Sequence, residues 1–175
     1  LKKFRAGIEE VSIDGMTTDV ELATIRGRAL AQIDAQIACW SQSIRPLLAA
    51  EGIHFLDPQD YTPAIDMWLA QYFRDHIFPV LTPLAFDPGH PFPYISNLSM
   101  NLAVRVRHAG RTRFGRVKVP GMLSRFIALP EQLSPRGGMS HVFLEDVIRR
   151  NIQTLFPGTQ VEGTHLFRII RDTDM

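Results

Sequence analysis

The spacing of apolar residues changes across a proline-rich segment, and this change constrains the fold more than any other feature. Before residue 78, apolar residues recur every three or four positions, as on one face of an α-helix. After residue 98 they alternate with polar residues, as in a half-buried strand. Residues 79–93 hold five prolines, which exclude a helix and predict an extended loop. Helices followed by strands predict an α+β fold.

Two amphipathic helices are expected before the prolines. Thr18 and Glu21 fit a capping box at the start of a long helix, and Pro46 should kink or end it. Gly52 provides a C-terminal cap, and Thr62-Pro63 suits the first residues of a second helix. The apolar face of the long helix comprises Leu22, Ile25, Ala29, Ile33, Ile37, Trp40, Ile44 and Leu47. We place a domain boundary at its end, dividing the chain into residues 1–51 and 52–175.

A small antiparallel sheet packed with helices is expected after the prolines. Residues 98–107 alternate as a strand, and the turn at 108–112 leads to a second strand through Val117 and Val119. Residues 125–129 are a further candidate strand. A third helix over 144–155 and a last strand over 166–171 complete the predicted elements.

Composition and motifs exclude several classes of protein. Hydrophobic residues make up 45% and charged residues 21%, which is ordinary for a globular domain. No apolar run approaches the roughly 20 residues that a transmembrane helix needs. Cys39 is the only cysteine, so an intrachain disulfide is impossible, which suits a reducing cytosol. The sequence has no glycine-rich phosphate-binding loop and no His-Glu-x-x-His motif, and its six histidines lack metal-ligand spacing.

Positive charge is concentrated in the middle of the chain. Residues 88–130 hold seven Lys or Arg and no acidic residue. Arg105 and Arg107 alternate on one expected strand, and Arg116 and Lys118 on the next, so the four side chains can share a face. Such a face could bind the phosphates of a polyanion, because Arg matches their geometry and Lys supplies a point charge. The alternative is a solvated outer face that keeps the sheet from aggregating.

Two further arginines, Arg168 and Arg171, flank the last apolar pair of the sequence. They could face phosphate as part of the same substrate-binding set. The alternative is an ion-pair cluster with Asp172 and Asp174. Nucleic acid is not expected as the polyanion, because only Phe114 lies close enough to stack on a base.

Several runs together resemble one family in their order and spacing, the polyphosphate kinases of the first, bacterial type. The runs from the head domain of that family are 90–103 (HPFPYISNLSMNLA), 116–120 (RVKVP), 125–130 (RFIALP), 143–148 (FLEDVI), 155–158 (LFPG) and 167–172 (FRIIRD). The run 78–84 is also typical of the family. Trp40 and residues 47–52 look like the end of its N-terminal domain.

The resemblance implies an enzyme that reversibly moves the terminal phosphate of ATP onto inorganic polyphosphate, with Mg²⁺ as cofactor. A histidine in the C-terminal region of such enzymes becomes phosphorylated, which divides one transfer into two steps. Head domains help to form a homodimer, and the polyphosphate product is thought to lie in a basic tunnel.

The resemblance also limits what this chain contains. Because the chain begins at Leu1 and stops directly after a strand-like run, we expect an internal piece of a longer protein. Residues 1–51 would be the end of the N-terminal helical domain, and 52–175 the head domain, cut at its C-terminal end. No catalytic or metal-binding residue is assigned, because none of the six histidines matches the phosphorylated one. The family implies a cytoplasmic enzyme, with peripheral membrane association left open.

Three roles therefore remain open at the level of sequence. The chain could be a non-catalytic part of a polyphosphate kinase that supplies scaffold and substrate-channel surface. It could instead be an independent polyanion-binding module, with Arg105, Arg107, Arg116 and Lys118 as its ligands. It could also be an architectural module whose exposed apolar residues meet a second copy.

Overall fold

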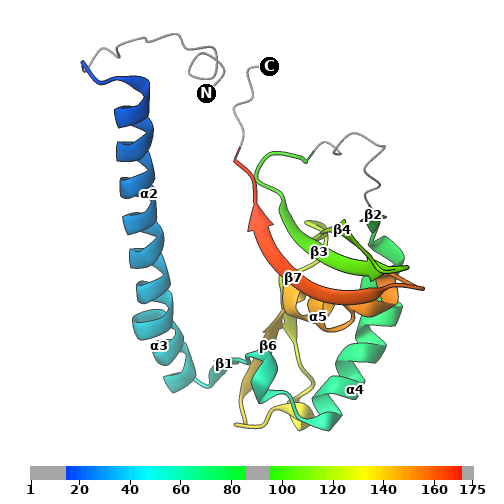
Figure 1. The fold of residues 1–175 in the computed structure, drawn as a ribbon. Coiled ribbons are helices and arrows are strands. Elements are labelled where there is room, and N and C mark those ends of the chain that lie inside the picture. The colour runs from blue at the N-terminus through cyan, green and yellow to red at the C-terminus, as the bar shows by residue number, and fades with distance from the viewer. Residues whose placement is uncertain (1–14, 86–94, 171–175) are drawn as a thin grey trace. The chain divides into compact units, whose positions relative to one another are not determined.

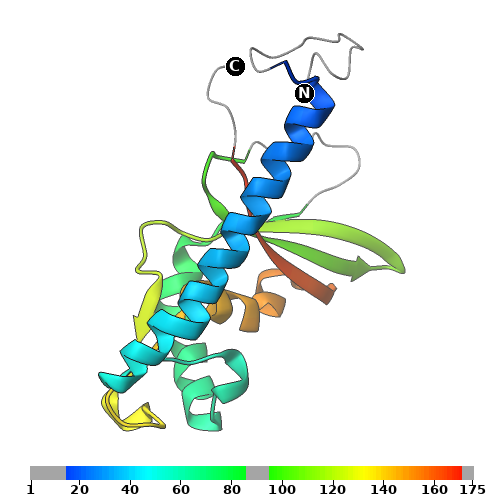
Figure 2. The same cartoon turned by 90° about the vertical axis from the view of Figure 1, so that its left-hand side faces the viewer.

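The computed structural model describes residues 15–85 and 95–170, and the chain divides into two compact units between Glu51 and Gly52. The described part of the first unit is one helical element (Figure 1), in which α2 (Thr18–Cys39) passes through a π-turn at Trp40–Ile44 into α3 (Arg45–Ala50). Figure 2 shows these segments as one continuous helix. Within the described residues, no helix is long and apolar enough to cross a membrane.

The N-terminal end of this helix differs from the sequence-based expectation, and its C-terminal end agrees with it. Its N-cap is Thr17 rather than Thr18, and the Thr17 hydroxyl donates to the Asp19 carboxylate instead of capping the backbone. The predicted capping box is therefore wrong. A π-turn precedes Pro46, and the helix then ends at Ala50, with Gly52 at a φ of 76° as the predicted C-terminal cap.

Among the described residues of the first unit, none covers the apolar stripe of α2. Ile25, Ile33 and Ile37 are 56%, 48% and 59% exposed, and no residue of α2 is buried. A helix buries a stripe of this kind only by packing it against another element. The stripe is therefore a surface that another element can cover.

The second unit begins its helical part as the sequence predicts. Thr62 caps α4 (Pro63–Tyr72), and its side-chain oxygen accepts a bond of 3.3 Å from the Ile65 amide. The helix continues through a π-turn at Phe73–Ile77 and a 3₁₀ turn at Phe78–Val80, where the prolines begin. Residues 86–94, with His90 and three of the five prolines, lie outside the described residues.

A four-stranded antiparallel sheet forms the larger layer of the second unit. Its strand order is β2-β4-β3-β7, with β2 at Leu84–Ala85, β3 at Met100–His108, β4 at Arg111–Lys118 and β7 at Gln160–Arg168. The predicted hairpin of β3 and β4 is present, and its turn places Ala109 and Gly110 at positive φ. The last strand begins six residues earlier than the sequence predicted.

A second sheet of three strands was not predicted. β1 (Ile53–Phe55) pairs in parallel with β6 (Met139–Phe143), and β5 (Phe126–Ala128) pairs antiparallel with the other edge of β6. The strands have only three to five residues, and the parallel partners are more than 80 residues apart in the sequence. A pairing of that kind leaves little local signal. The prediction of an α+β fold is confirmed, with two sheets instead of one.

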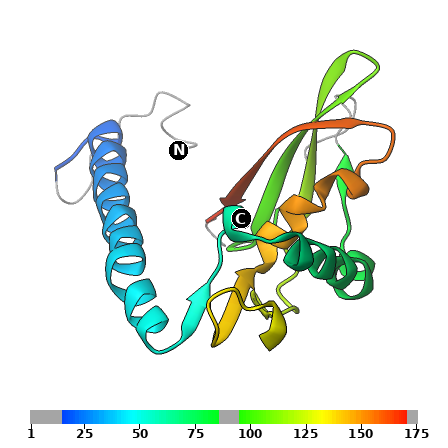
Figure 3. The same ribbon diagram turned by 90° about the horizontal axis from the view of Figure 1, so that it is seen from below.

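The core lies between the four-stranded sheet and two helices. Figures 1 and 3 show α4 and α5 (Leu144–Arg150) on the same side of this sheet. The predicted third helix ends at Arg150, because the Asn151 side chain donates to the Val147 carbonyl, and a 3₁₀ turn at Ile152–Leu155 follows. The fully buried side chains that fill this layer include Ile65, Leu69, Phe73, Ile77, Leu102, Val104, Val117, Val142, Leu144 and Ile148.

Replacing two glycines in strands by alanine should change the stability of the fold in opposite directions. A Cβ at Gly115 would lie 2.5 Å from Cε1 of Phe156, a ring that is only 5% exposed, whereas a Cβ at Gly163 would meet nothing within 4 Å. We expect Gly115→Ala to lower the free energy of unfolding by about 1–3 kcal/mol through overpacking. Gly163→Ala should leave it unchanged or raise it by about 0.5 kcal/mol. Urea denaturation measures both, and equal effects would contradict the packing of Phe156 on β4.

Candidate polyanion-binding face

The register of β3 with β4 brings the four predicted basic residues onto one face. Ala103 lies opposite Arg116, Arg105 opposite Phe114, and Asn101 opposite Lys118. Because residues directly opposite one another in an antiparallel pair share a face, Arg105, Arg107, Arg116 and Lys118 all leave the sheet on the same side. We call this side of the four-stranded sheet the basic face.

The opposite side of the same strands is the core side, which explains why the basic residues point outward. Leu102 and Val104 on β3, and Val117 on β4, have no exposed surface. Arg105, Arg107 and Lys118 alternate with such residues and are exposed, while Arg116 is half-buried. Packing of one side thus determines the chemistry of the other.

A β-bulge in the neighbouring strand adds an acidic residue to this face. Gly163 lies opposite Arg105 and Val161 lies opposite Val106, so Glu162 is an extra residue without a partner of its own. Its carboxylate Oε2 lies 3.3 Å from Arg105 Nε, and Arg107 Nε donates a hydrogen bond to its Oε1. The exposed fractions of these side chains are 53% for Arg105, 54% for Arg107 and 15% for Glu162. One carboxylate therefore bridges two of the four predicted cations.

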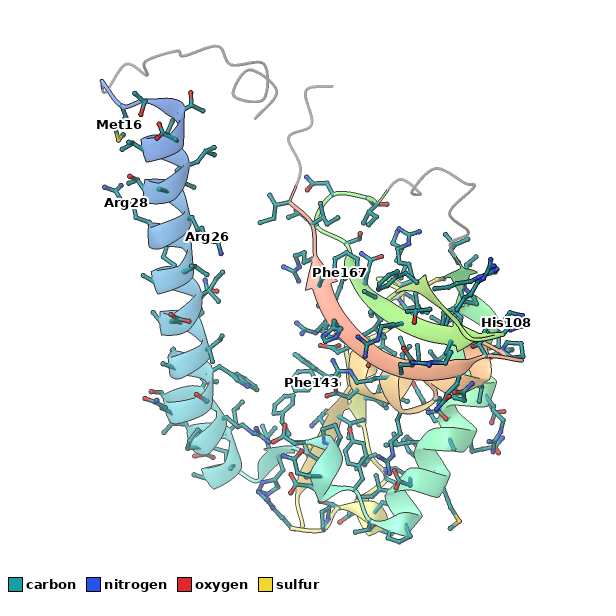
Figure 4. The ribbon with its side chains drawn as sticks, in the orientation of Figure 1. Met16, Arg26, Arg28, His108, Phe143 and Phe167 are labelled. Carbon is teal, nitrogen blue, oxygen red and sulfur yellow. The ribbon has the colours of Figure 1, made fainter. Side chains whose placement is uncertain are left out.

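The bridged pair lines a shallow hollow near the hairpin end of the sheet. Arg105, Arg107 and Thr112 contribute to it from the hairpin, and Gln160, Val161 and Glu162 from β7. Figure 4 shows the side chains of this region, with His108 at the hairpin end and Phe167 toward the other end of β7. Since guanidinium groups line this hollow, an anion with several oxygens suits its chemistry.

Lys118 lies at the other end of the hairpin, beside a different hollow of about 320 Å³. Arg125 also lines this hollow, and its guanidinium binds Glu145 through an Nη2–Oε1 contact of 2.6 Å and an Nε–Oε1 contact of 3.1 Å. The rest of the lining is mostly apolar, including Leu98, which has a φ of 58°. Lys118 and the pair of Arg105 and Arg107 therefore line different hollows, at opposite ends of the hairpin.

Of the two remaining predicted site residues, only Arg168 lies within the described residues, and it does not join the basic face. Arg168 lies opposite Met100, so its side chain leaves β7 on the same side as Leu102 rather than Arg105. Arg171 lies outside the described residues.

The sequence analysis did not identify three residues of the basic face. Two of them, Phe167 and Glu162, change its chemistry by adding an aromatic ring and a carboxylate. His165 and Phe167 lie opposite Ala103 and Asn101, and Phe167 adds a half-buried aromatic ring to the exposed Phe114. Glu162 was missed because the start of β7 was missed. The sequence nevertheless contains a sign of the bulge. Val161 lies opposite Val106 and Leu166 lies opposite Leu102, both on the core side, yet the two residues are five positions apart. Residues on one side of a regular strand are an even number of positions apart, so this odd spacing requires one extra residue.

A separate group of titratable side chains lies where α4 and α5 meet. Arg150 binds the Asp66 carboxylate at 2.5 Å, and Arg149 lies 3.3 Å from Asp146. Burial raises the pKa of the Tyr61 phenol well above its ordinary value, and burial also raises the pKa of Asp146. These groups join two core helices, and the described residues contain no cluster of three or more His, Cys, Asp or Glu that could hold a metal ion.

Comparison with known proteins identifies the family. The family model described as the polyphosphate kinase middle domain matches residues 65–175. The chain belongs to the polyphosphate kinase family. The polyphosphate kinase of Thermosynechococcus vestitus is 43% identical over 99% of this chain, and polyphosphate kinase 1 of Chlorobaculum tepidum is 41% identical over the same share. The chain covers 24% and 26% of those two proteins, so it spans about a quarter of the length of each.

The fold agrees with a solved member of the family. The crystal structure of polyphosphate kinase from Porphyromonas gingivalis matches with a TM-score of 0.79 and 27% sequence identity, over 88% of this chain and 24% of that protein. The resemblance that the sequence motifs indicated is thereby confirmed.

The ion pair of Arg125 and Glu145 gives a test of the geometry beside Lys118. The Glu145 side chain is only 5% exposed, so removing its partner leaves a nearly buried carboxylate unpaired. We expect Arg125→Met to lower the free energy of unfolding by about 1–3 kcal/mol. The double variant Arg125→Met with Glu145→Met should lose less than Arg125→Met alone, because it removes the buried charge as well. A loss below about 0.5 kcal/mol for Arg125→Met would contradict the pairing.

Proposed function

We propose that the chain is the end of the N-terminal helical domain and the head domain of a polyphosphate kinase. The longer enzyme would reversibly transfer the terminal phosphate of ATP to inorganic polyphosphate, with Mg²⁺ bound by residues elsewhere. Family membership and a span of about a quarter of its relatives support this assignment. The phosphorylated histidine is assigned to a part of the enzyme outside this chain, so the chain alone is expected to have no kinase activity.

The contribution of this chain would be a surface on which polyphosphate lies. The observation that carries this proposal is the placement of Arg105, Arg107, Arg116 and Lys118 on one face of a sheet whose other face is the core. Successive phosphates of a polyphosphate chain carry closely spaced negative charge, which guanidinium groups bind through paired N–H donors. A sheet holds the backbone positions of such donors fixed, so little conformational entropy is lost when the ligand binds.

Binding of long-chain polyphosphate by the 175-residue chain tests this role. The double variant Arg105→Gln with Arg107→Gln should weaken binding on the order of tenfold or more, and the dependence of log K on log salt should become shallower by roughly 1–2. The matched control is Arg26→Gln with Arg28→Gln, which removes the same charge from exposed positions of α2 (Figure 4). Unchanged affinity in the first variant would remove the basic face from the proposal.

Competition with single-stranded DNA separates polyphosphate from a general polyanion. Phe114 is 59% exposed and Phe167 is half-buried on the same face, which is more aromatic surface than the sequence suggested. Base stacking needs such rings. Because only one of these two rings is more than half exposed, we expect DNA to compete poorly at equal phosphate concentration. Competition on equal terms would favour an independent polyanion-binding module.

A second role, assembly with another copy of the chain, rests on the outer face of the three-stranded sheet. Phe126 and Met139 are 47% and 59% exposed there, and the rings of Phe126 and Phe143 meet at 5.6 Å. Exposed aromatic and methionine side chains that gather on one sheet are typical of interfaces. We propose that this face meets the same face of a second copy in a homodimer.

Sedimentation equilibrium at several concentrations tests this assembly. Phe126→Ser with Met139→Ser should shift the chain toward monomer, because both side chains would lie in the interface. Ile25→Ser with Ile37→Ser is the matched control, since it removes two equally exposed apolar side chains from α2. If only the α2 variant dissociates the chain, the interface belongs to the helix and the proposal for the sheet is wrong.

A further inference from the structure

The carboxylate on the basic face occupies the place that a phosphate would take. A phosphate group binds arginines by offering two oxygens to two sets of N–H donors. Glu162 already does this: one oxygen accepts a bond from Arg107 Nε, and the other lies 3.3 Å from Arg105 Nε. The three side chains together carry a single positive charge instead of the two that the arginines alone would offer.

We propose that Glu162 is an internal competitor that limits how tightly the basic face holds polyphosphate. The inference rests on the proposed polyphosphate-binding role and concerns its regulation by one residue. A phosphate that approaches Arg105 and Arg107 must either displace the carboxylate or bind beside it, and in both cases the carboxylate opposes binding. Glu162 is thus a specificity-determining residue.

The position of Glu162 makes this opposition effective. Its side chain is 15% exposed, so little water screens the carboxylate from the two guanidinium groups, which are about half exposed. It arises from the extra residue of a β-bulge, a feature that redirects a side chain onto a neighbouring strand. The arginines use Nε toward Glu162, and their half-exposed side chains can still present Nη groups to a ligand. The carboxylate therefore weakens the site without closing it.

The consequence is a preference for long chains over single phosphates. If each contact is weak, a ligand with one phosphate gains little, whereas a long polyanion gains by engaging several contacts at once. Weak contacts also allow a bound chain to move along the face, as ions move through a channel whose sites bind without trapping them. A surface that serves a growing polymer needs both properties.

The test is the isosteric variant Glu162→Gln in the 175-residue chain, measured with long-chain polyphosphate and with orthophosphate. We expect affinity for long-chain polyphosphate to rise about tenfold and its salt dependence to steepen by about one, because one more positive charge becomes available. Inhibition by orthophosphate should strengthen as well. Glu131→Gln, at an exposed position in the 3₁₀ turn Glu131–Leu133, is the matched control and should change neither.

Two further variants keep the outcome decisive. Adding Glu162→Gln to the Arg105→Gln and Arg107→Gln double variant should give no gain, and a persisting gain would show a general charge effect and overturn the inference. Glu162→Asp keeps the charge but cannot reach both arginines, so it should give a smaller gain and serves if Glu162→Gln does not fold.

The failures of the two proposals are distinguishable. If Glu162→Gln lowers affinity or leaves it unchanged while the arginine double variant weakens binding, Glu162 does not compete and instead positions the arginines. The polyphosphate-binding face would then stand and this inference would fall. If the arginine double variant has no effect, the basic face itself fails, and the inference falls with it.

Discussion

The pleat of β3 is the constraint on which the rest of the second unit depends. Leu102, Val104 and Val106 of this strand are buried against the helices, and the intervening Arg105 and Arg107 must therefore point to the opposite side. Both neighbouring strands, β4 and β7, pair antiparallel with β3, so their side chains follow the same division. A shift of one residue in the register of β4 on β3 would move Arg116 and Lys118 to the core side, where their charges would be unpaired. Packing of the core thus keeps the basic side chains on the outer side of the sheet, and no ligand is needed for this.

The bulge at Glu162 is the one departure from this regular pairing, and it lies where the arginines are. With regular pairing in place of the bulge, alternation from Gly163 back along β7 would place Glu162 on the core side and Val161 on the basic face, where Val161 would lose its contact with the core. The bulge restores Val161 to the core side and directs Glu162 at Arg105 and Arg107. One backbone irregularity therefore serves packing and charge together. This coupling explains why a substitution at Glu162 should be made with an isosteric side chain, so that the two effects remain separate.

Local periodicity was sufficient to predict α4, the hairpin and the α+β class, since each depends on residues close in the sequence. It failed for β1 and β6, because their parallel pairing joins Ile53 to Met139 and each strand is too short to show alternation. It also placed the capping box at Thr18, where the side chain competes with an equally suitable neighbour, Thr17. For the candidate site, parity placed Arg105, Arg107, Arg116 and Lys118 on one face correctly. Arg168 was predicted as a substrate-binding residue without a face being assigned to it, and its pairing opposite Met100 places it on the side of Leu102.

The charge of residues 88–130 is a second case in which the local sequence does not reveal contacts with residues far away in the chain. Residues 88–130 contain no acid, and their composition alone suggests seven uncompensated cations. The fold brings Glu145 to Arg125 and Glu162 to Arg105 and Arg107, so within the described residues at least three of the seven have acidic partners from later in the chain. Long-range pairing therefore decides how much of a local charge excess becomes surface potential. In this chain it reduces the excess at Arg105 and Arg107, which suits the proposed role of a surface that holds a polymer and also releases it.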